Sequence, residues 1–426
     1  MRRSFFGLTT PRFQYDTMIG KLPAPVKIAT PKRATFLIEG ETGQMNNILI
    51  KKGDRVKTGQ KISLSDLTDA YAISSVTGRI ISIEPFPGES GKQYTAVSVD
   101  VSDVEATDTC FEALCDSPTA EVAEKYLSFL PGDLSLTALK DPDKPIHTLV
   151  INAVDRDLFV VTARYAIAAH LKDLKKGIGI LKSITGIDNI VLAASRDTLQ
   201  GYGEIGASAI SIDSSYPYGL PYFIAQDIVG HEFPVNQSLQ ELGLCFLSVE
   251  AVVSLGRSFK NKKIADTKLI TFIDKGGNRS LITAKIGTPI GDIFKAFNLS
   301  LNDQDRIIIG GPMTGYTVFS ESYPIQPGTD AIMVQDKDDI AFVSDYPCIN
   351  CGECIRVCPA RIQVNLLIRF LEAGQFEDAA DNYDLFSCLD CGLCSFVCVS
   401  RIPIFQYITL AKYELGKLNT EETTDE

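Results

Sequence analysis

The sequence predicts a multidomain α/β protein with a β-sandwich, a parallel α/β domain, a second β-rich module and a helical C-terminal domain. Two observations predict this class. The spacing of apolar residues changes along the chain from the alternation typical of strands to a strand–helix–strand pattern, and then back to strands. Near the C-terminus the pattern becomes helical, and eight of the eleven cysteines lie there, between Cys348 and Cys398.

The composition limits the size and the partners of the protein. With 426 residues, 45% of them hydrophobic, the chain can form several domains. The net charge of −12 argues against nucleic acid as a partner, because phosphate binding needs an excess of Lys and Arg. No apolar run is long enough to cross a bilayer. The start Met1–Phe6 is similar to a twin-arginine export signal, but Gly7–Gln14 is too polar to continue one, so we expect a cytoplasmic protein.

The N-terminal part predicts an arm and a sandwich. Residues 1–35 are rich in proline and basic side chains, which predicts an extended arm on the surface. Residues 36–100 alternate apolar and polar positions between glycines, as in Lys51–Val56 and Val76–Ile83, and predict short strands joined by turns. This segment resembles the biotinyl/lipoyl-like sandwich. It has no Met-Lys or Asp-Lys hairpin that would carry biotin or lipoate, so we expect a structural role.

Residues 101–262 predict a parallel α/β domain. Ile146–Asn152 and Asn189–Ala194 are apolar runs of strand length, and the amphipathic helix Arg164–Ile184 lies between them. The segment Gly201–Gly206 matches the G-x-G-x-x-G fingerprint of dinucleotide-binding proteins. That fingerprint needs a strand before it and a helix after it, and neither is indicated here, so we interpret the segment as a loop.

Residues 263–345 return to strand patterns and predict a β-grasp module. Lys268–Ile273 and Ser280–Ile286 flank a glycine turn, and a short helix over Ile290–Phe297 follows. Further on, Gly310–Gly315 forms a tight turn whose backbone could approach a cofactor or a partner closely.

Residues 346–417 predict a helical domain. Arg361–Ala373 and a second helix that ends at Gly416 each place apolar residues on one face, and a glycine follows each of these faces. The acidic residues 418–426 predict a disordered tail.

Two cysteine runs predict the chemistry of this domain. Each has the spacing C-x2-C-x2-C-x3-C, in which one loop supplies three thiolates to a [4Fe–4S] cluster and the last cysteine ligates the other cluster of a two-cluster protein. The spacing assigns to cluster 1 the residues Cys348, Cys351, Cys354 and Cys398. It assigns to cluster 2 the residues Cys388, Cys391, Cys394 and Cys358. A zinc site would need two C-x2-C pairs with nothing left over, whereas a further cysteine completes both runs.

The other residues of metal-binding type predict no site. None of the three histidines has a second one at metal-binding spacing: His147, His170 and His231. The remaining cysteines are interpreted as packing residues: Cys110, Cys115 and Cys245. No Ser/His/Asp or paired-carboxylate arrangement is indicated, and we assign no catalytic residue.

Taken in chain order, these motifs resemble the C subunit of Rnf complexes, the RnfC family. The resemblance covers nearly the whole chain and rests on both cysteine runs together with Lys21–Pro23, Lys51–Val56, Ile286–Pro289 and Gly310–Met313. It implies a barrel-sandwich domain, a Rossmann-like α/β domain similar to the 51 kDa-subunit fold, an SLBB-like β-grasp domain and an α-helical ferredoxin domain with two clusters.

This chain departs from the RnfC pattern in the α/β domain, at the nucleotide site that the resemblance implies. In that family the α/β domain binds FMN and NADH, and a glycine-rich loop cradles phosphates. The corresponding stretch, Phe129–Ser135, has no glycine run, and the next strand keeps Asn152 but neither glutamate of the family pattern. Tyr216–Gly219 keeps only part of a further family turn. Because backbone amides cradle a phosphate only where no Cβ intervenes, we predict a degenerate FMN and NADH site and assign no residue to either cofactor.

These features predict an iron–sulfur subunit that relays single electrons between a soluble or flavoprotein donor and a partner subunit of a redox complex. The resemblance implies a membrane-bound complex with this chain at the inner face of the cell membrane, in an anaerobic setting. Two alternatives stay open. One is a divergent FMN-containing NADH:acceptor oxidoreductase subunit, and the other is a non-redox scaffold whose clusters only stabilise the fold.

Overall fold

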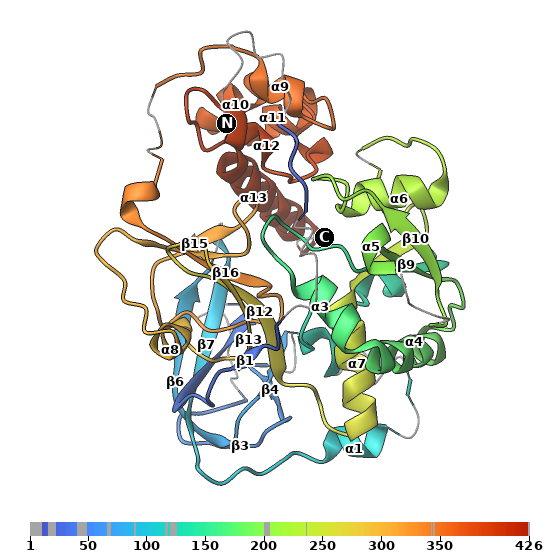
Figure 1. Ribbon diagram of the computed structural model, residues 1–426, viewed down its shortest axis with the longest axis vertical. Helices are drawn as coiled ribbons and strands as arrows, with labels where there is room; N and C mark the ends of the chain where they lie inside the picture. Colours follow the sequence, from blue (N-terminus) through green and yellow to red (C-terminus); the bar gives the residue numbers. More distant parts are fainter. Residues whose placement is uncertain are drawn as a thin grey trace.

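Figure 1 shows the computed structural model, in which a helical domain lies beyond one end of two β-rich domains and an α/β domain. The structure describes residues 11–15, 23–40, 49–65, 70–88, 91–115, 118–119, 126–199, 205–235, 237–341, 343 and 346–424. The motif residues Met1–Phe6 and Gly201–Glu204 lie outside these ranges. None of the described helices is both long enough and apolar enough to span a bilayer.

The first domain is a β-sandwich. Its antiparallel sheet has the order β2 (Arg33–Glu39), β7 (Gln93–Val101), β6 (Gly78–Pro87) and β3 (Arg55–Val56), and a separate pair joins β4 (Lys61–Ser63) to β5 (Tyr71–Ile73). Alternate side chains such as Phe36 and Val97 are fully buried. Gly78 lets β6 lie close to β7, because a Cβ at this position would collide with the Asp100 carbonyl.

Two described parts of the predicted surface arm are built into the fold. Val26–Lys27 forms β1, which pairs in parallel with a strand of the third domain. Gln14 forms a backbone bridge to Ser215, and the neighbouring Tyr15 is buried. Pairing between residues so far apart leaves no periodic signal in the sequence, and for that reason the pattern alone indicated only an extended segment.

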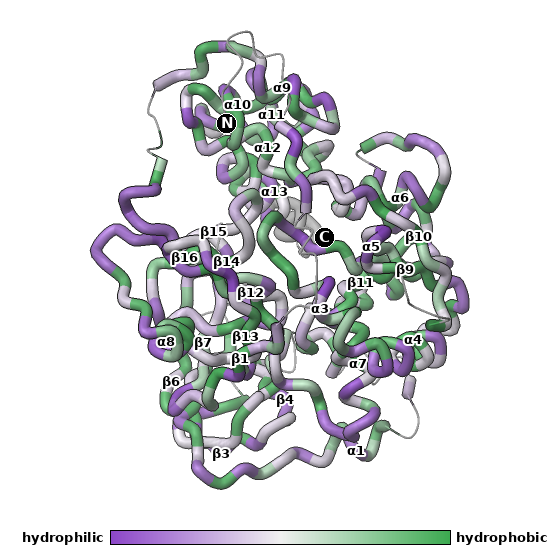
Figure 2. Tube along the Cα trace, in the orientation of Figure 1, coloured by the Kyte–Doolittle hydropathy of each residue, from purple (hydrophilic) through white to green (hydrophobic). Residues whose placement is uncertain are grey.

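The α/β domain is built on a parallel sheet with the order β10 (Ser208–Ile212), β9 (Ile190–Ser195), β8 (Thr148–Asn152) and β11 (Leu244–Ser248). The long helices of the domain are α3 (Thr162–Ala169), α4 (Leu171–Thr185), α6 (Pro221–Val229) and α7 (Val249–Asn261). Along α4, hydrophobic and hydrophilic residues alternate (Figure 2), and the buried side includes Leu174, Ile178 and Leu181.

The single helix predicted over Arg164–Ile184 is wrong, because the chain forms two helices. They meet at His170, whose φ of −126° is not helical. The His170 carbonyl accepts hydrogen bonds from Asp173 and Leu174 and so begins the second helix. The bend lets α4 lie directly against α7, where a Cβ at Gly256 would collide with the Asp173 carbonyl. This bend depends on packing between distant residues, which periodicity does not report.

The third domain is a six-stranded sheet with the order β1, β13 (Arg279–Lys285), β12 (Thr267–Ile273), β16 (Ala331–Gln335), β14 (Arg306–Ile309) and β15 (Tyr316–Val318). The hairpin of β12 and β13 is followed by helix α8 (Ile290–Ala296), as the sequence predicts, and β16 then pairs in parallel with β12. Apolar side chains from the strands and from α8 form one core, including Phe272, Ile282 and Ile293.

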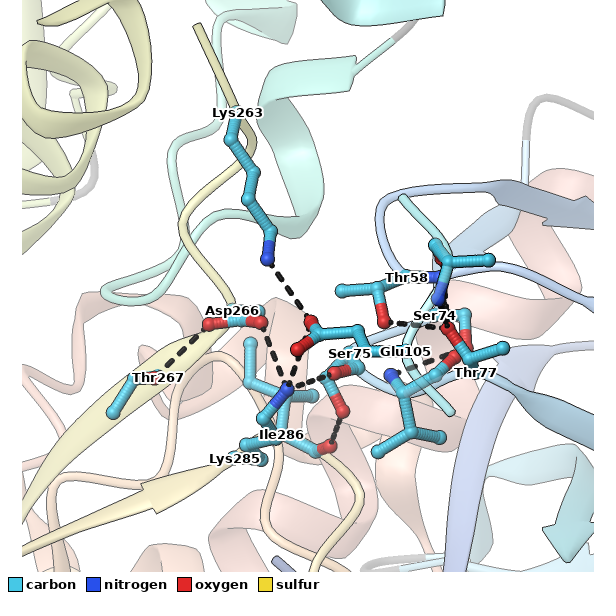
Figure 3. Close-up of polar contacts among 12 residues, drawn as sticks. Thr58, Ser74, Ser75, Thr77, Glu105, Lys263, Asp266, Thr267, Lys285 and Ile286 are labelled. Atoms are coloured by element: carbon cyan, nitrogen blue, oxygen red, sulfur yellow. Dashed lines mark hydrogen bonds and ion pairs between the residues drawn. The ribbon is translucent and has the colours of Figure 1, made fainter. Parts of the chain in front are cut away.

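A polar cluster joins the first three domains (Figure 3). The ammonium group of Lys285, on β13, donates to the Ser75 carbonyl at 2.7 Å and to the Asp266 carboxylate at 3.2 Å. Ser75 in turn donates to the Ile286 carbonyl. Glu105, which follows the sandwich, accepts from Lys263 just beyond α7 at 3.1 Å. The sandwich is thus tied to both neighbouring domains, to the third domain through the buried and partly buried contacts of Ser75 and Lys285 and to the α/β domain through the exposed pair of Glu105 and Lys263.

The C-terminal domain consists of short helices around the cysteine runs. They are α9 (Glu353–Val357), α10 (Val364–Glu372), α11 (Phe376–Asn382), α12 (Leu393–Val397) and α13 (Ile404–Thr424). Gly374 has a φ of +72° and separates α10 from α11, as predicted. The predicted helix end at Gly416 is wrong, because α13 continues to Thr424, whereas the disordered tail over 418–426 stays a prediction. Gly416 does not adopt the left-handed conformation that ends a helix.

Shorter elements complete the described chain. They are α1 (Cys110–Leu114), η3 (Leu127–Phe129), η4 (Thr137–Lys140), α5 (Arg196–Leu199), η5 (Lys337–Asp339) and η6 (Leu385–Ser387).

Candidate functional site

The eight clustered cysteines line two separate small cavities, four to each. The thiols around the first cavity belong to Cys348, Cys351, Cys354 and Cys398. Those around the second belong to Cys358, Cys388, Cys391 and Cys394. Each cavity therefore combines three cysteines of one run with the last cysteine of the other run. This grouping is the one that the spacing of the two runs predicts.

The two runs fold alike because the same backbone conformations recur in each. The residue before the second cysteine has a positive φ, Asn350 at 59° and Asp390 at 53°. The glycine after that cysteine is also left-handed, with φ of 73° at Gly352 and 69° at Gly392. Each glycine precedes a five-residue helix, and α9 and α12 pack against each other. Left-handed turns reverse the chain tightly, and so each loop wraps its three thiols around one cavity.

The donor set fits iron–sulfur clusters. Thiolates are the ligands of [4Fe–4S] clusters, and each cavity presents four. Desolvation raises the pKa of the Cys354 thiol to about 11, so without bound iron this group is protonated at neutral pH. Backbone amides also face the sulfurs, with Ile402 donating to Cys398 at 3.4 Å and Asp390 donating to Cys388 at 3.5 Å. Amide groups in such positions stabilise negative charge on sulfur.

The second cavity lies against the rest of the protein. The Tyr216 hydroxyl donates to the Cys391 carbonyl at 2.6 Å, and the backbone at Met313 contacts Gly392 so closely that no Cβ would fit there. The side chains of Cys391 and Leu393 belong to the same apolar cluster as Val150 on β8. The helical domain is therefore packed onto the edge of the parallel sheet at which its strands end.

Two buried carboxylates occupy that edge of the sheet. Asp155 accepts two hydrogen bonds from the Arg164 guanidinium, at 3.0 and 3.1 Å. Asp157 accepts from the backbone amides of Met313 and Thr314, the latter at 2.7 Å, and from the Thr314 hydroxyl. The Gly310–Gly315 turn, which was predicted to approach a cofactor or a partner closely, lies against other parts of the same chain. It holds Asp157 and contacts the second cysteine loop.

The remaining histidines and cysteines lie apart from the two cavities. His147 contacts its neighbour Thr148, His170 lies at the bend between α3 and α4, and Cys245 is buried on β11. Sequence reasoning missed Asp157 and Tyr216 as neighbours of the cysteines. The polar residues directly after β8 were a usable signal, because ligands and contacts gather where parallel strands end.

Family models match one segment near each end of the chain. The family model described as the RnfC barrel sandwich hybrid domain matches residues 22–104, and that of the 4Fe-4S dicluster domain matches residues 341–399. The C subunit of the Na(+)-translocating ferredoxin:NAD(+) oxidoreductase complex of Acetobacterium woodii is 23% identical over 78% of this chain and 80% of its own length. Over most of its length the chain is thus similar to the C subunits of these complexes, and its sandwich domain matches the RnfC model.

Other RnfC relatives differ in length. The C subunit of the proton-translocating ferredoxin:NAD(+) oxidoreductase complex of Clostridium ljungdahlii is 26% identical over 92% of this chain and 90% of its own length. The C subunit of the ion-translocating oxidoreductase complex of Pseudomonas aeruginosa is 26% identical over 86% of this chain, which spans only half of that relative. Crystal structures of an NAD+-reducing [NiFe]-hydrogenase align with a TM-score of 0.43 and 15% identity over 71% of this chain and 63% of the hydrogenase chain.

The 4Fe-4S dicluster match confirms the prediction of two [4Fe–4S] clusters. The stretch predicted to lack the glycine-rich loop has a different role in the structure. Leu130 and Leu134 are buried in the core, and Gly132 sits on the start of α7, where the Ser248 hydroxyl donates to its carbonyl at 2.6 Å. A Cβ at Gly132 would collide with the backbone of Ala251. Phe129, Leu130 and Leu134 are thus packed inward, and the degenerate FMN and NADH site stays a prediction.

Proposed function

We propose that this chain is the iron–sulfur electron-transfer subunit of an Rnf-like oxidoreductase complex. The observation that carries the proposal is the pair of four-thiol cavities, one packed against the α/β domain and the other beside the exposed Cys351. The clusters, when bound, supply one-electron transfer. The protein holds them in place, shields one from water and aims amide groups at the sulfurs, which together set their potentials.

The ligand sets that we propose follow the two cavities. Cluster 1 is held by Cys348, Cys351, Cys354 and Cys398. Cluster 2 is held by Cys388, Cys391, Cys394 and Cys358. We also propose the domain boundaries that the sequence predicts, with the β-grasp module over 263–345 and the ferredoxin domain from residue 346.

We also propose that the chain does not accept hydride from NADH. Asp155 is paired with Arg164, and Asp157 is held by the 310–315 turn, so neither carboxylate is available to a nucleotide. The burial of Phe129, Leu130 and Leu134 supports the same conclusion. Electrons therefore come from a soluble or flavoprotein partner. We further propose that the chain acts as a peripheral subunit at the inner face of the cell membrane, since relatives are named as subunits of ion-translocating complexes.

One set of measurements tests this function. Anaerobically purified protein is assayed for iron, acid-labile sulfide and flavin, and its cluster absorption is followed after NADH is added. We expect about eight irons, no flavin and no bleaching by NADH, while dithionite bleaches the absorption. Stoichiometric flavin with rapid bleaching by NADH would favour the alternative of a divergent NADH:acceptor oxidoreductase. About eight irons whose absorption dithionite does not bleach would favour the scaffold, and fewer than about four irons would contradict the presence of two clusters.

A further inference from the structure

The two cysteine loops are near copies of each other, yet only one of them is covered. We define the cluster-1 loop as Ile349–Gly352 and the cluster-2 loop as Leu389–Gly392. Equivalent hydrogen bonds follow in both: Arg356 donates to the Gly352 carbonyl at 3.1 Å, and Phe396 donates to the Gly392 carbonyl at 3.2 Å. The two loops therefore present the same backbone surface to whatever lies beyond them.

The cluster-2 loop is covered by the protein itself. The turn at residues 310–315 presses the Met313 backbone onto Gly392, and Tyr216 binds the Cys391 carbonyl. Cys391 is 7% exposed as a result. A turn that presents its backbone and an apolar side chain can therefore pack closely on a loop with this backbone conformation.

The cluster-1 loop is open. A Cβ added at Gly352 would meet nothing within 4 Å, and Cys351 is exposed. Ile349 is 62% exposed although it lines the cysteine cavity. Val399, directly after Cys398, is also exposed, so two apolar side chains flank the ligands of one site. In Figure 1, α9, which follows this loop, lies at the outer end of the helical domain, away from the β-rich domains.

The charges around the cluster-1 loop favour an acidic partner. Glu353 is neutralised by Arg356, at 2.9 Å. Arg401 is exposed and pairs with no acidic side chain among the described residues, which leaves a local positive charge on a protein whose net charge is −12. Attraction of an acidic surface to this side chain would orient a partner over the loop.

We propose that the cluster-1 loop is the docking surface for an acidic one-electron carrier protein, which covers it with a turn as the 310–315 turn covers the cluster-2 loop. This inference rests on the proposed relay function and adds to it the place and the kind of partner. Electron transfer needs close approach, and of the two loops only the cluster-1 loop offers a one-electron carrier an exposed cysteine ligand.

The test uses the full chain with its clusters and, as the probe, an oxidised acidic two-cluster ferredoxin. Binding is measured by isothermal titration calorimetry, which reports complex formation independently of electron transfer. Two variants alter the loop: Ile349→Glu, which removes an apolar contact and repels an acidic partner, and Gly352→Asn, in which asparagine tolerates the left-handed conformation. The matched control is Val104→Glu, because Val104 is 74% exposed in the segment that follows the sandwich.

We expect both loop variants to weaken binding at least about tenfold, with iron content unchanged and the control binding like the unaltered chain. Higher ionic strength weakens binding of the unaltered chain. Equal binding by all proteins, or equal loss in the control, would overturn the proposal. So would a dimer of the chain alone that Ile349→Glu dissociates in sedimentation velocity, because a second copy would then be the occupant. If the clusters are intact in these cases, only the docking proposal fails and the relay function is unaffected. Low iron in the unaltered chain would instead contradict the relay function itself.

Discussion

The buried carboxylate of Asp155 depends on one side chain, the Arg164 guanidinium. Burial raises the pKa of Asp155 to about 6, and the charge and hydrogen bonds of Arg164 oppose that rise. At neutral pH Asp155 is therefore ionised in the folded protein, and its interaction with Arg164 offsets the free-energy cost of burying this charge. The Ala163 amide also donates to Asp155, but Arg164 carries the opposite charge, and a buried charge that loses its charged partner is strongly destabilising.

We expect Arg164→Met to reduce the free energy of unfolding at pH 7.5 by about 3–5 kcal/mol. The sign of the pH dependence follows from the raised pKa of Asp155. Its ionised form is penalised in the folded state, so the penalty is present above the folded pKa and disappears as the pH falls towards the ordinary value for aspartate. Urea unfolding should therefore show the variant recovering stability between pH 7.5 and pH 5 relative to the unaltered chain. In the double variant Asp155→Asn with Arg164→Met this recovery should vanish, and its persistence would contradict the assignment.

Asp157 is a positioning residue for the turn that covers the cluster-2 loop. Its carboxylate accepts from the Leu158 and Thr314 amides at 2.6 and 2.7 Å, and Met313 lies between Thr314 and the cysteine loop. We expect Asp157→Asn to destabilise the protein by about 2–3 kcal/mol, because hydrogen bonds to a charged acceptor are lost.

The same variant removes a buried negative charge close to one cluster only. In a redox titration followed by electron paramagnetic resonance, the potential of cluster 2 should therefore rise while that of cluster 1 stays constant. Asp303→Asn, at an exposed position in the third domain, serves as the control for a change in net charge. A uniform shift of both potentials would show that the charge of Asp157 does not act on cluster 2 alone, and no shift would show that Asp157 acts only on folding.

At the scale of elements, the cysteine runs were predictable and their surroundings were not. The spacing of three cysteines in one loop is a local property, and the left-handed conformations at Gly352 and Gly392 agree with it. Strand and helix patterns likewise located β8, β9, β12 and β13 to within a few residues. The bend at His170 and the cover formed by Met313 depend on contacts between residues far apart in the chain, which no local pattern encodes.

Because each cavity takes cysteines from both runs, paired substitutions should affect one or both clusters depending on which cavity the two residues line. We expect Cys348→Ser with Cys398→Ser to remove one cluster and leave about four irons, because both residues line the first cavity. Cys348→Ser with Cys358→Ser should damage both clusters, since these residues line different cavities although they belong to one run. Iron analysis and electron paramagnetic resonance of the anaerobically purified variants measure this. If each run held its own cluster, the two pairs would exchange their outcomes.

At the scale of the whole molecule, the helical domain is coupled to the α/β domain through the second cavity. Val357, Cys391 and Leu393 share one apolar cluster with Val150 and Tyr216, so the second cysteine loop is part of the core beneath it. The first cavity has no such contact through its own loop, since a Cβ at Gly352 would meet nothing among the described residues. Loss of metal at the two sites should therefore have unequal effects on the rest of the protein.

We expect removal of all iron by chelation under oxidising conditions to lower the melting temperature of the α/β domain as well as that of the helical domain. Metal binding energy is folding energy where the ligands have no site in the unfolded chain, and the second cysteine loop transmits its loss to the edge of the parallel sheet. The matched comparison is the pair Cys348→Ser with Cys398→Ser, which empties only the first site. Differential scanning calorimetry should show that this pair destabilises the helical domain and leaves the α/β transition in place, whereas Cys388→Ser with Cys358→Ser lowers both. Equal effects of the two pairs would mean that the contacts of Met313 and Tyr216 with the cluster-2 loop do not couple the domains.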